Sequence, residues 1–373
     1  MPANPFKLVL IVNCHWAARE MQSREAANST LDYMTKSRSS LANSIRIDFA
    51  SVFLCLFGAL PAFATDGIYT KFGLDLGYAG RIGYMGGTTP EWAIYVYGAG
   101  TSSSRFNALD ISSPPDATGL QVDGDIALAG VYSTLTVSGH TSISGGDRFE
   151  QMTSTESINS TGTITGSRFS STMINSQLNS GVTSLKNVSM TAAGLTATAT
   201  SPTSLNIGKN QSRTFDNTSF GGKYVMNLSS FVMGGGTNGG NGGMLTLNGA
   251  AGSAFVINVS GAFSLGSNAR IVLAGGLTVS DVLFNVTGSN STFSIGGDAL
   301  FNGTLLAYNK SGAQRTLTIS GHNTQINGEL LANKIQLQSG AHVKKPKEKS
   351  KDDDDDDDYA ASNSMMPARA GTK

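Results

Sequence analysis

The sequence predicts an all-β protein, a right-handed parallel β-solenoid with a flanking α-helix at about residues 170–196. Two observations carry this prediction: short apolar runs that recur at a near-constant interval, and a composition suited to strands and tight turns. Charged residues make up only 14% of the 373 residues and 45 are glycine, yet 39% are apolar. Because these apolar residues alternate in short runs, the composition indicates many short strands and not disorder.

The repeat is clearest between residues 254 and 343. The line Phe-Val-Ile-Asn-Val-Ser-Gly at 255–261 returns as Leu-Phe-Asn-Val-Thr-Gly at 283–288. The line at 301–309 returns at 326–333, with Asn-Gly and Leu-Leu-Ala in the same order. An interval of about 25 residues is typical of one solenoid coil stacking on the next. Asn258 is therefore expected to stack on Asn285. Four apolar positions of these lines should point inward: Val259, Val286, Leu305 and Leu330.

Residues 1–64 are predicted to be an N-terminal extension plus a signal peptide. Ser51–Ala64 is an apolar run that follows basic residues and ends in Ala-Phe-Ala. This order is typical of a secretory signal peptide, with cleavage after Ala64, and it predicts a secreted or cell-surface protein. The run is short for a membrane span, so none is expected in the mature chain. Because the extension is long, the start codon is left open between Met1 and Met34.

The mature solenoid domain is predicted to cover residues 65–343. Aromatic residues are dense from 65 to 100, and Trp92–Gly98 reads as a strand. We expect this first segment to cap the N-terminal end of the core. The alternative is an exposed aromatic face that stacks on sugars.

A long excursion separates two parts of the same solenoid. Leu135–His140, Leu-Thr-Val-Ser-Gly-His, is nearly repeated at Leu317–His322, which places both in one stack. Between them, apolar residues fall at helical spacing in the 170–196 region. The residues that define this helical face are Ile174, Leu178, Val182, Leu185 and Val188 or Ser189.

Two low-complexity stretches are expected to lie outside the stacked strands. Gly234–Gly243 is predicted to be a flexible loop because it is rich in glycine. It lacks the Lys-Ser/Thr end of a P-loop, so it is not expected to bind phosphate. Residues 344–373 are predicted to be a disordered charged tail. Within this tail, Asp352–Asp358 lacks the spaced carbonyls and turn glycine of a calcium site, and its role is left open.

No catalytic, cofactor-binding or metal-ligating residues are predicted, and the chain is not expected to be an enzyme. The histidines are widely spaced, and both cysteines precede the predicted cleavage site. The net charge of zero gives no electrostatic support for a nucleic-acid partner. A β-helix polysaccharide lyase, the least favoured reading, would need clustered charged residues. The acids on which it could draw are Asp123, Asp125 and Asp147, because 218–343 contains only Asp281, Asp298 and Glu329.

Several of these lines resemble the choice-of-anchor A family of bacteria, an adhesive domain of secreted and surface proteins. The resemblance implies a β-solenoid with a central helical segment and no catalytic residues. It leaves anchoring open, because neither an LPxTG-like motif nor a final apolar helix is present. The matching lines are Trp92–Gly98, Leu120–Gly130, Phe255–Gly261, Leu283–Gly288, Asn302–Ala307 and Ile326–Leu337.

Two functional hypotheses follow. The preferred one is a secreted, non-catalytic adhesin-like or surface-display protein that binds an extracellular polymer, glycan or matrix protein through a solenoid face. The alternative is an ice-binding solenoid, because a flat face with ordered threonines could order water. Threonine is common in strands anyway, and the pairs do not recur once per coil. Ligand identity and oligomeric state stay open. The spaced threonines are Thr134/Thr136, Thr161/Thr163/Thr165, Thr196/Thr198/Thr200 and Thr316/Thr318.

Overall fold

The structure is a computed structural model that describes residues 71–74, 92–114, 119–220, 222–236, 240–288, 293–308 and 315–345. The chain divides into two units, Met1–Phe63 and Ala64–Lys373, and every described residue belongs to the second. The predicted signal peptide, its extension and the Asp352–Asp358 run lie outside the described residues.

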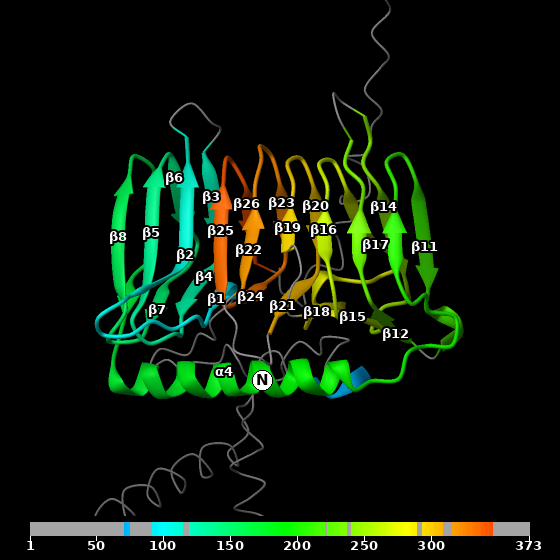
Figure 1. Ribbon diagram of the computed structural model, residues 1–373, viewed down its shortest axis with the longest axis horizontal. Coiled ribbons are helices and arrows are strands. Elements are labelled where there is room, and N and C mark those ends of the chain that lie inside the picture. The colour runs from blue at the N-terminus through cyan, green and yellow to red at the C-terminus, as the bar shows by residue number, and fades with distance from the viewer. Residues whose placement is uncertain are drawn as a thin grey trace, which may run out of the picture. The chain divides into compact units, whose positions relative to one another are not determined.

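Three sheets, each made only of parallel strands, form a β-solenoid, as predicted (Figure 1). We name them sheets A, B and C and give their strands in spatial order. Sheet A contains β12 (Lys223–Leu228), β15 (Ala254–Val259), β18 (Val282–Val286), β21 (Thr304–Ala307), β24 (Leu330–Ala332), β1 (Trp92–Val96), β4 (Asp125–Leu128), β7 (Arg148–Glu150) and β9 (Arg168–Phe169). Sheet B contains β10 (Leu205–Ile207), β13 (Phe231–Met233), β16 (Phe263–Leu265), β19 (Phe293–Ile295), β22 (Thr316–Ile319), β25 (Lys334–Gln338), β2 (Phe106–Ser113), β5 (Ser133–Gly139) and β8 (Thr155–Ser160). Sheet C contains β11 (Ser212–Asp216), β14 (Met244–Asn248), β17 (Arg270–Ala274), β20 (Leu300–Asn302), β23 (Gln325–Asn327), β26 (His342–Lys344), β3 (Leu120–Asp123) and β6 (Thr141–Ser144).

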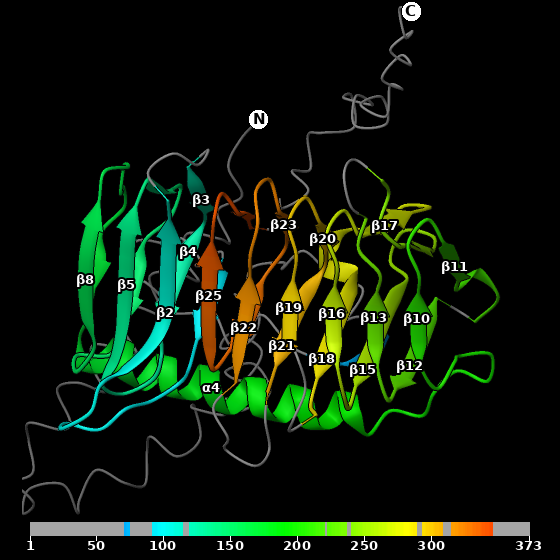
Figure 2. The ribbon, with the colours of Figure 1, turned by 45° about the horizontal axis from the view of Figure 1, so that its top comes forward.

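The chain enters the solenoid in the middle of the stack. It builds β1 to β9 toward one end, crosses to the other end through α4 (Thr172–Ala193), and returns from β10 to β26. The returning coil closes against the first one, since β24 pairs with β1, β25 with β2 and β26 with β3 (Figure 2). This path confirms that the two Leu-Thr-Val/Ile-Ser-Gly-His lines belong to one solenoid. They lie in β5 and β22, and Leu135 and Leu317 occupy the same row of sheet B.

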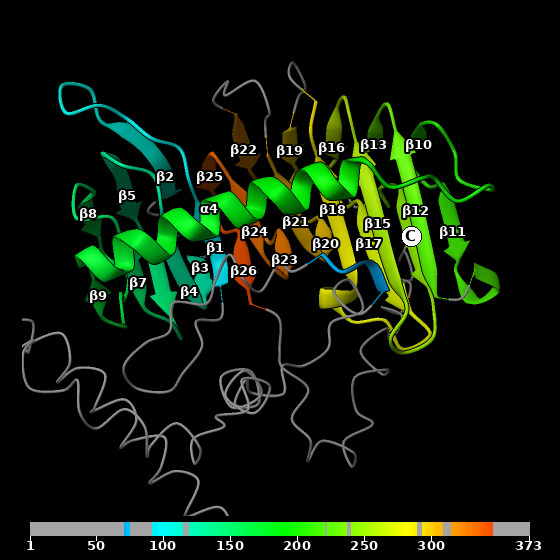
Figure 3. The same ribbon diagram turned by 90° about the horizontal axis from the view of Figure 1, so that it is seen from below.

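The predicted helix lies along sheet A, crossing its strands (Figure 3). At about 1.5 Å per residue its 22 residues span about 33 Å. The distance from β7 to β15 is six strand spacings of about 4.8 Å, or about 29 Å, so one straight helix covers it. The Ser171 side chain caps its first turn by accepting from Ile174 N at 3.2 Å. Most residues that the spacing predicted for the packed face are buried: Ile174, Leu178, Leu185, Val188 and Ser189. The sixth, Val182, is half-buried and packs against the same apolar cluster.

The repeated asparagines hold the helix against sheet A. Asn258 and Asn285 are register partners, as predicted, and the Asn285 amide donates to Asn258 Oδ1 at 2.8 Å. Asn258 also donates to Ala192 O at 2.7 Å, and Asn285 donates to Ser189 O at 2.9 Å. The ladder therefore satisfies polar groups that the helix buries.

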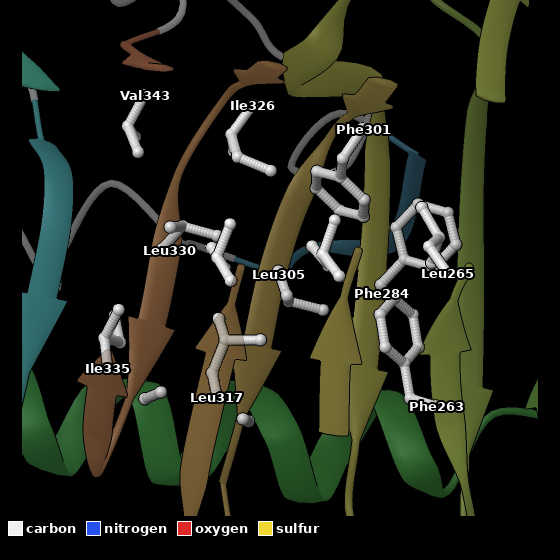
Figure 4. Packing of buried hydrophobic residues seen from close by; sticks show 14 of the residues in the cluster. Phe263, Leu265, Phe284, Phe301, Leu305, Leu317, Ile326, Leu330, Ile335 and Val343 are labelled. Carbon is white, nitrogen blue, oxygen red and sulfur yellow. The ribbon is translucent and has the colours of Figure 1, made fainter. Parts of the chain in front are cut away.

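The solenoid interior is filled by inward-pointing apolar residues from all three sheets (Figure 4). Parallel stacking puts like on like, so Leu305 lies against Leu330 and Phe301 against Ile326. The four residues predicted to point inward are all fully buried in this cluster: Val259, Val286, Leu305 and Leu330.

Two repeated glycines turn the chain from sheet C into sheet A. Gly303 and Gly328 have φ angles of 138° and 132°, which are open only to glycine. A Cβ on Gly328 would also lie 2.0 Å from Gly303 O. The Asn-Gly pairs of the repeat are thus corner residues as well as strand ends.

The expectation of an N-terminal cap at the first strand is wrong, and so is its alternative. Trp92–Val96 does not cap an end, because β1 lies between β24 and β4. Nor do its aromatics form an exposed sugar platform: Trp92, Tyr95 and Tyr97 are buried, and Tyr95 Oη donates to Leu178 O at 2.7 Å. The described part of Gly234–Gly243 is a loop between β13 and β14, as predicted, and Gly236 N donates to Ser267 O at 2.7 Å.

Charged side chains close the end of the stack at β7 and β8. Arg148, Glu150 and Glu156 stand in register with Ile126, Leu128 and Leu135 of the preceding coil. Their charges are paired: Arg148 Nε lies 2.7 Å from Glu156, and Arg168 Nη2 lies 2.6 Å from Glu150. Burial, together with a hydrogen bond to Glu156, raises the pKa of Glu150 to about 8. Burial also acts to raise the pKa of Glu156, but hydrogen bonds from Glu150 and Arg148 outweigh it and lower that pKa.

Candidate binding face

The outward side of sheet B is the candidate site, and we call it the B face. Sheet A is covered by α4, and an apolar layer fills the space between them. The B face instead presents a row of outward side chains, one from each of its nine strands and all polar except Val232, in continuous register along the whole stack. That row is Asn206, Val232, Ser264, Ser294, Thr318, Gln336, Asp110, Thr136 and Ser157.

Alternation along each short strand produces this face. In β16 and β19, Phe263 and Phe293 point inward while Ser264 and Ser294 point outward and are half-buried. The two hydroxyl oxygens lie 3.4 Å apart. A strand of three residues, such as β16 or β19, leaves only one outward side chain per coil, and here that side chain is a short serine.

The part of the B face built from β2, β5 and β8 is tied together by hydrogen bonds. Thr134 and Thr155 hydroxyl oxygens lie 3.3 Å apart. The Asn107 amide, in the orientation that satisfies its neighbours, donates to Thr136 Oγ1 and to Leu109 O, both at 3.2 Å. These contacts hold polar groups in fixed positions, which favours recognition of a ligand with regular spacing.

Two of the four threonine sets lie on the B face. Thr134 and Thr136 belong to β5, and Thr316 and Thr318 belong to β22. The other two sets do not: residues 161–165 follow β8, and Thr198 pairs with Val225, accepting from its N–H at 2.9 Å. The structure therefore brings two of the four predicted threonine sets to one face.

The two threonine pairs are separated by charged and longer side chains. Between them, in the rows of Thr318 and Thr316, stand Gln336, Asp110 and Lys334. The Lys334 ammonium lies 6.0 Å from the centre of the Phe106 ring. The middle of the B face is therefore more polar than an uninterrupted threonine array would be.

The aspartates that a lyase would need are corner caps. Asp125 Oδ1 accepts from Asp147 N at 2.6 Å, and Asp147 Oδ1 accepts from Ser167 N at 2.8 Å. Each carboxylate thus holds the equivalent corner of the next coil. Asp123 ends β3, two residues before Asp125. The geometry assigns Asp125 and Asp147 a structural task.

The histidines do not converge. His140 and His322 are exposed at turns, whereas His342 lies in β26, where burial lowers its pKa. Across the described ranges, no three His, Cys, Asp or Glu side chains are grouped so that they could hold a metal ion. No helix in the described part of the chain is long and apolar enough to cross a membrane.

Sequence reasoning missed two features of this face. The side chains that separate the two threonine pairs could not be predicted, because β2 and β25, which carry them, are neighbours in space but more than 200 residues apart in sequence. The charged end beside β8 was also missed, since Arg148 and Glu156 read as ordinary surface residues. The sequence did contain a signal for this charged end. The alternation in 148–158 places charged residues where earlier coils have Leu and Ile.

A continuous row of outward side chains on a parallel solenoid is typical of repeat proteins with an extended surface. Residues 91–343 match the family described as "Putative Ice-binding-like adhesive domain", so the chain belongs to that family. The finer resemblance to the choice-of-anchor A family is not shown by this match. No curated protein matches the chain.

Solved structures of ice-binding proteins are similar in fold. LeIBP from an Arctic yeast is 19% identical, with a TM-score of 0.44 over 74% of this chain and 95% of its own. The ice-binding protein of the Antarctic ascomycete Antarctomyces psychrotrophicus is 16% identical, with a TM-score of 0.40 over 74% and 99%. An ice-binding protein domain of Shewanella frigidimarina is 15% identical, with a TM-score of 0.41 over 69% and 95%.

Proposed function

We propose that this chain is an exported, non-catalytic adhesive protein whose B face binds an extended extracellular polymer. The observation that supports this most is the continuous row of nine outward side chains along sheet B. Eight strand spacings of about 4.8 Å give this row a length of about 38 Å.

Short hydroxyl and amide side chains suit such a ligand. Each makes one or two modest hydrogen bonds, and many such contacts on one polymer gain avidity without a deep pocket. The charges in the middle, Asp110 and Lys334, are of opposite sign, so they add specificity without giving the face a net charge. Membership of an adhesive-domain family supports the same function. Export rests on the Ser51–Ala64 run.

A matched pair of bulky substitutions tests the B face. Ser294→Tyr places a ring in the row, whereas Ser142→Tyr places the same ring on sheet C at an equally half-buried outward serine. Binding of the full chain to insoluble polysaccharides and immobilised matrix proteins would be measured by co-sedimentation. We expect S294Y to weaken binding at least about tenfold and S142Y to leave it unchanged. Equal binding by both variants would contradict the assignment of the face.

Ice binding is the second candidate, favoured by the two threonine pairs on the same face and by the family. The charges between the pairs allow a direct test. Replacing Asp110 and Lys334 together by threonine makes the centre of the face less charged and more regular. An ice-binding protein should gain thermal hysteresis from this change, whereas a polymer binder should lose affinity.

A further inference from the structure

A pocket opens at the corner where the coils turn from sheet B into sheet C. It lies at the start of β17, β20 and β23. Its volume of about 180 Å³ is below the range of about 300–1,000 Å³ for drug-sized ligands, so it admits one small cyclic unit. Its main lining residues are Asn268, Arg270, Asp298, Leu300, Asn323 and Gln325.

Three successive coils line the pocket with two parallel rows of side chains, which we call the grid: one row from the strands and one from the turns before them. Arg270 pairs in register with Leu300, and Leu300 with Gln325. Leu300 is half-buried, whereas Arg270 and Gln325 on either side are exposed. The central position therefore offers an apolar surface between two longer polar side chains.

The second line of the grid consists of turn residues. Asn268, Asp298 and Asn323 have φ angles of 60°, 54° and 54°, a left-handed conformation that Asn and Asp adopt more readily than other non-glycine residues. The Asn323 amide donates to Asp298 Oδ1 at 3.2 Å. An ionised carboxylate has about four acceptor positions, so Asp298 keeps capacity for further donors.

The chemistry of this grid fits a sugar ring. We propose that the pocket binds one pyranose unit of a neutral polysaccharide. Asp298 accepts from two adjacent hydroxyls, and the Arg270 guanidinium donates to a hydroxyl or ring oxygen. Among the described residues, no ion pair includes Arg270. The apolar face of the ring lies against Leu300, whose side chain can exclude water from it.

The charges of the pocket select a neutral ligand. Arg270 and Asp298 have opposite charges that cancel. An anionic sugar would be attracted by Arg270 but repelled by Asp298, and a cationic sugar would be attracted by Asp298 but repelled by Arg270. A neutral sugar meets neither penalty. The pocket is separate from the B face, since its lining residues belong to the corner and to sheet C. The two sites can therefore be tested independently.

The test uses the full chain and saturation-transfer NMR with neutral hexose trisaccharides, the corresponding free hexoses and a uronate trisaccharide. Asp298→Asn keeps the side-chain size and the left-handed turn but removes the charged acceptor. Arg270→Met keeps the aliphatic stem and removes the donors. Asp216→Asn is the matched control for D298N, because Asp216 is an exposed aspartate of sheet C outside the pocket that also accepts from an asparagine amide, that of Asn248 at 2.9 Å. Thermal unfolding verifies that all three variants fold.

We expect a neutral trisaccharide to bind in the millimolar range, and D298N and R270M each to weaken it at least about tenfold, with D216N unchanged. Binding of the free hexose as well would support a site for a single ring. Preference for the uronate trisaccharide, no saccharide binding, or binding that survives both pocket variants would overturn the proposal. Loss with S294Y, but with neither pocket variant, would assign the sugar to the B face, and the pocket proposal would fail while the proposed function stood.

Discussion

The buried carboxylate of Glu150 should make the stability of the solenoid fall as pH rises from about 4.5 to about 8. Its pKa is about 8 in the fold against an ordinary 4.5. Between these values the folded state holds a proton that the unfolded chain has released, so deprotonation favours unfolding. The difference of about 3.5 units corresponds to an upper limit of about 5 kcal/mol, at about 1.4 kcal/mol per unit.

The variant Glu150→Gln isolates this effect, because glutamine resembles the protonated acid and cannot ionise. At pH 5 the variant and the parent should have similar free energies of unfolding. At pH 8.5 the variant should be more stable by at least about 1 kcal/mol, up to the limit above. Urea unfolding followed by circular dichroism at several pH values between 4.5 and 9 measures both.

Glu156→Gln is the contrasting variant. The pKa of Glu156 is lowered, so its contribution is present above pH 4.5 and is lost as pH falls through its folded value. Removing its charge takes away the partner of Arg148, at 2.7 Å, and should destabilise the protein throughout pH 5 to 8. If E150Q showed the same pH slope as the parent protein, the reasoning about the charged end would be refuted.

The remaining predictions concern the stack and its helix. Leu305→Ala and Leu330→Ala should each cost roughly 2 to 5 kcal/mol in urea unfolding, because both side chains are fully buried; losses below about 0.5 kcal/mol in both would mean that the register is wrong. Asn285→Ala should cost about 1 to 3 kcal/mol and speed amide exchange in α4, since it leaves buried partners without their bonds; unchanged exchange would argue against the anchoring role. Gly130→Ala should destabilise more than Gly194→Ala in thermal unfolding, because the Cβ at 130 would lie 1.9 Å from a backbone oxygen of the neighbouring coil, whereas the nearest atoms to a Cβ at 194 are at 3.5 and 3.6 Å. Equal shifts would contradict this packing.

The stacking register was predictable where adjacent coils are also adjacent in sequence. Asn258 with Asn285 and Leu305 with Leu330 could be aligned by eye, because parallel stacking rewards like side chains at the same position. The helix was predictable because its apolar spacing follows 3.6 residues per turn. Both signals are local, and both were confirmed.

The position of the first coil was not predictable in the same way. Ile94 pairs with Leu330, and nothing in either line marks the other as its partner. The first strand of a solenoid sequence is expected to lie at one end of the stack. This expectation fails here because the chain later crosses to the far end and returns to pair with the first strand. The B face and the corner pocket depend on the same long-range pairing, so their composition emerges only from the assembled stack.

The charged end of the stack explains why the B face does not extend further in that direction. A parallel solenoid leaves unpaired backbone groups at its last strand, which invites another strand or a second copy. Here β7 and β8 place Arg148, Glu150 and Glu156 at positions where the preceding coil has apolar residues, and only the two-residue strand β9 lies beyond β7. Stacking an apolar coil on these side chains would bury charges against a surface that cannot pair with them, at a cost of several kcal/mol per ion. The charged end therefore stops growth, and the same residues that set the pH dependence of stability also set how many polar contacts the B face can make.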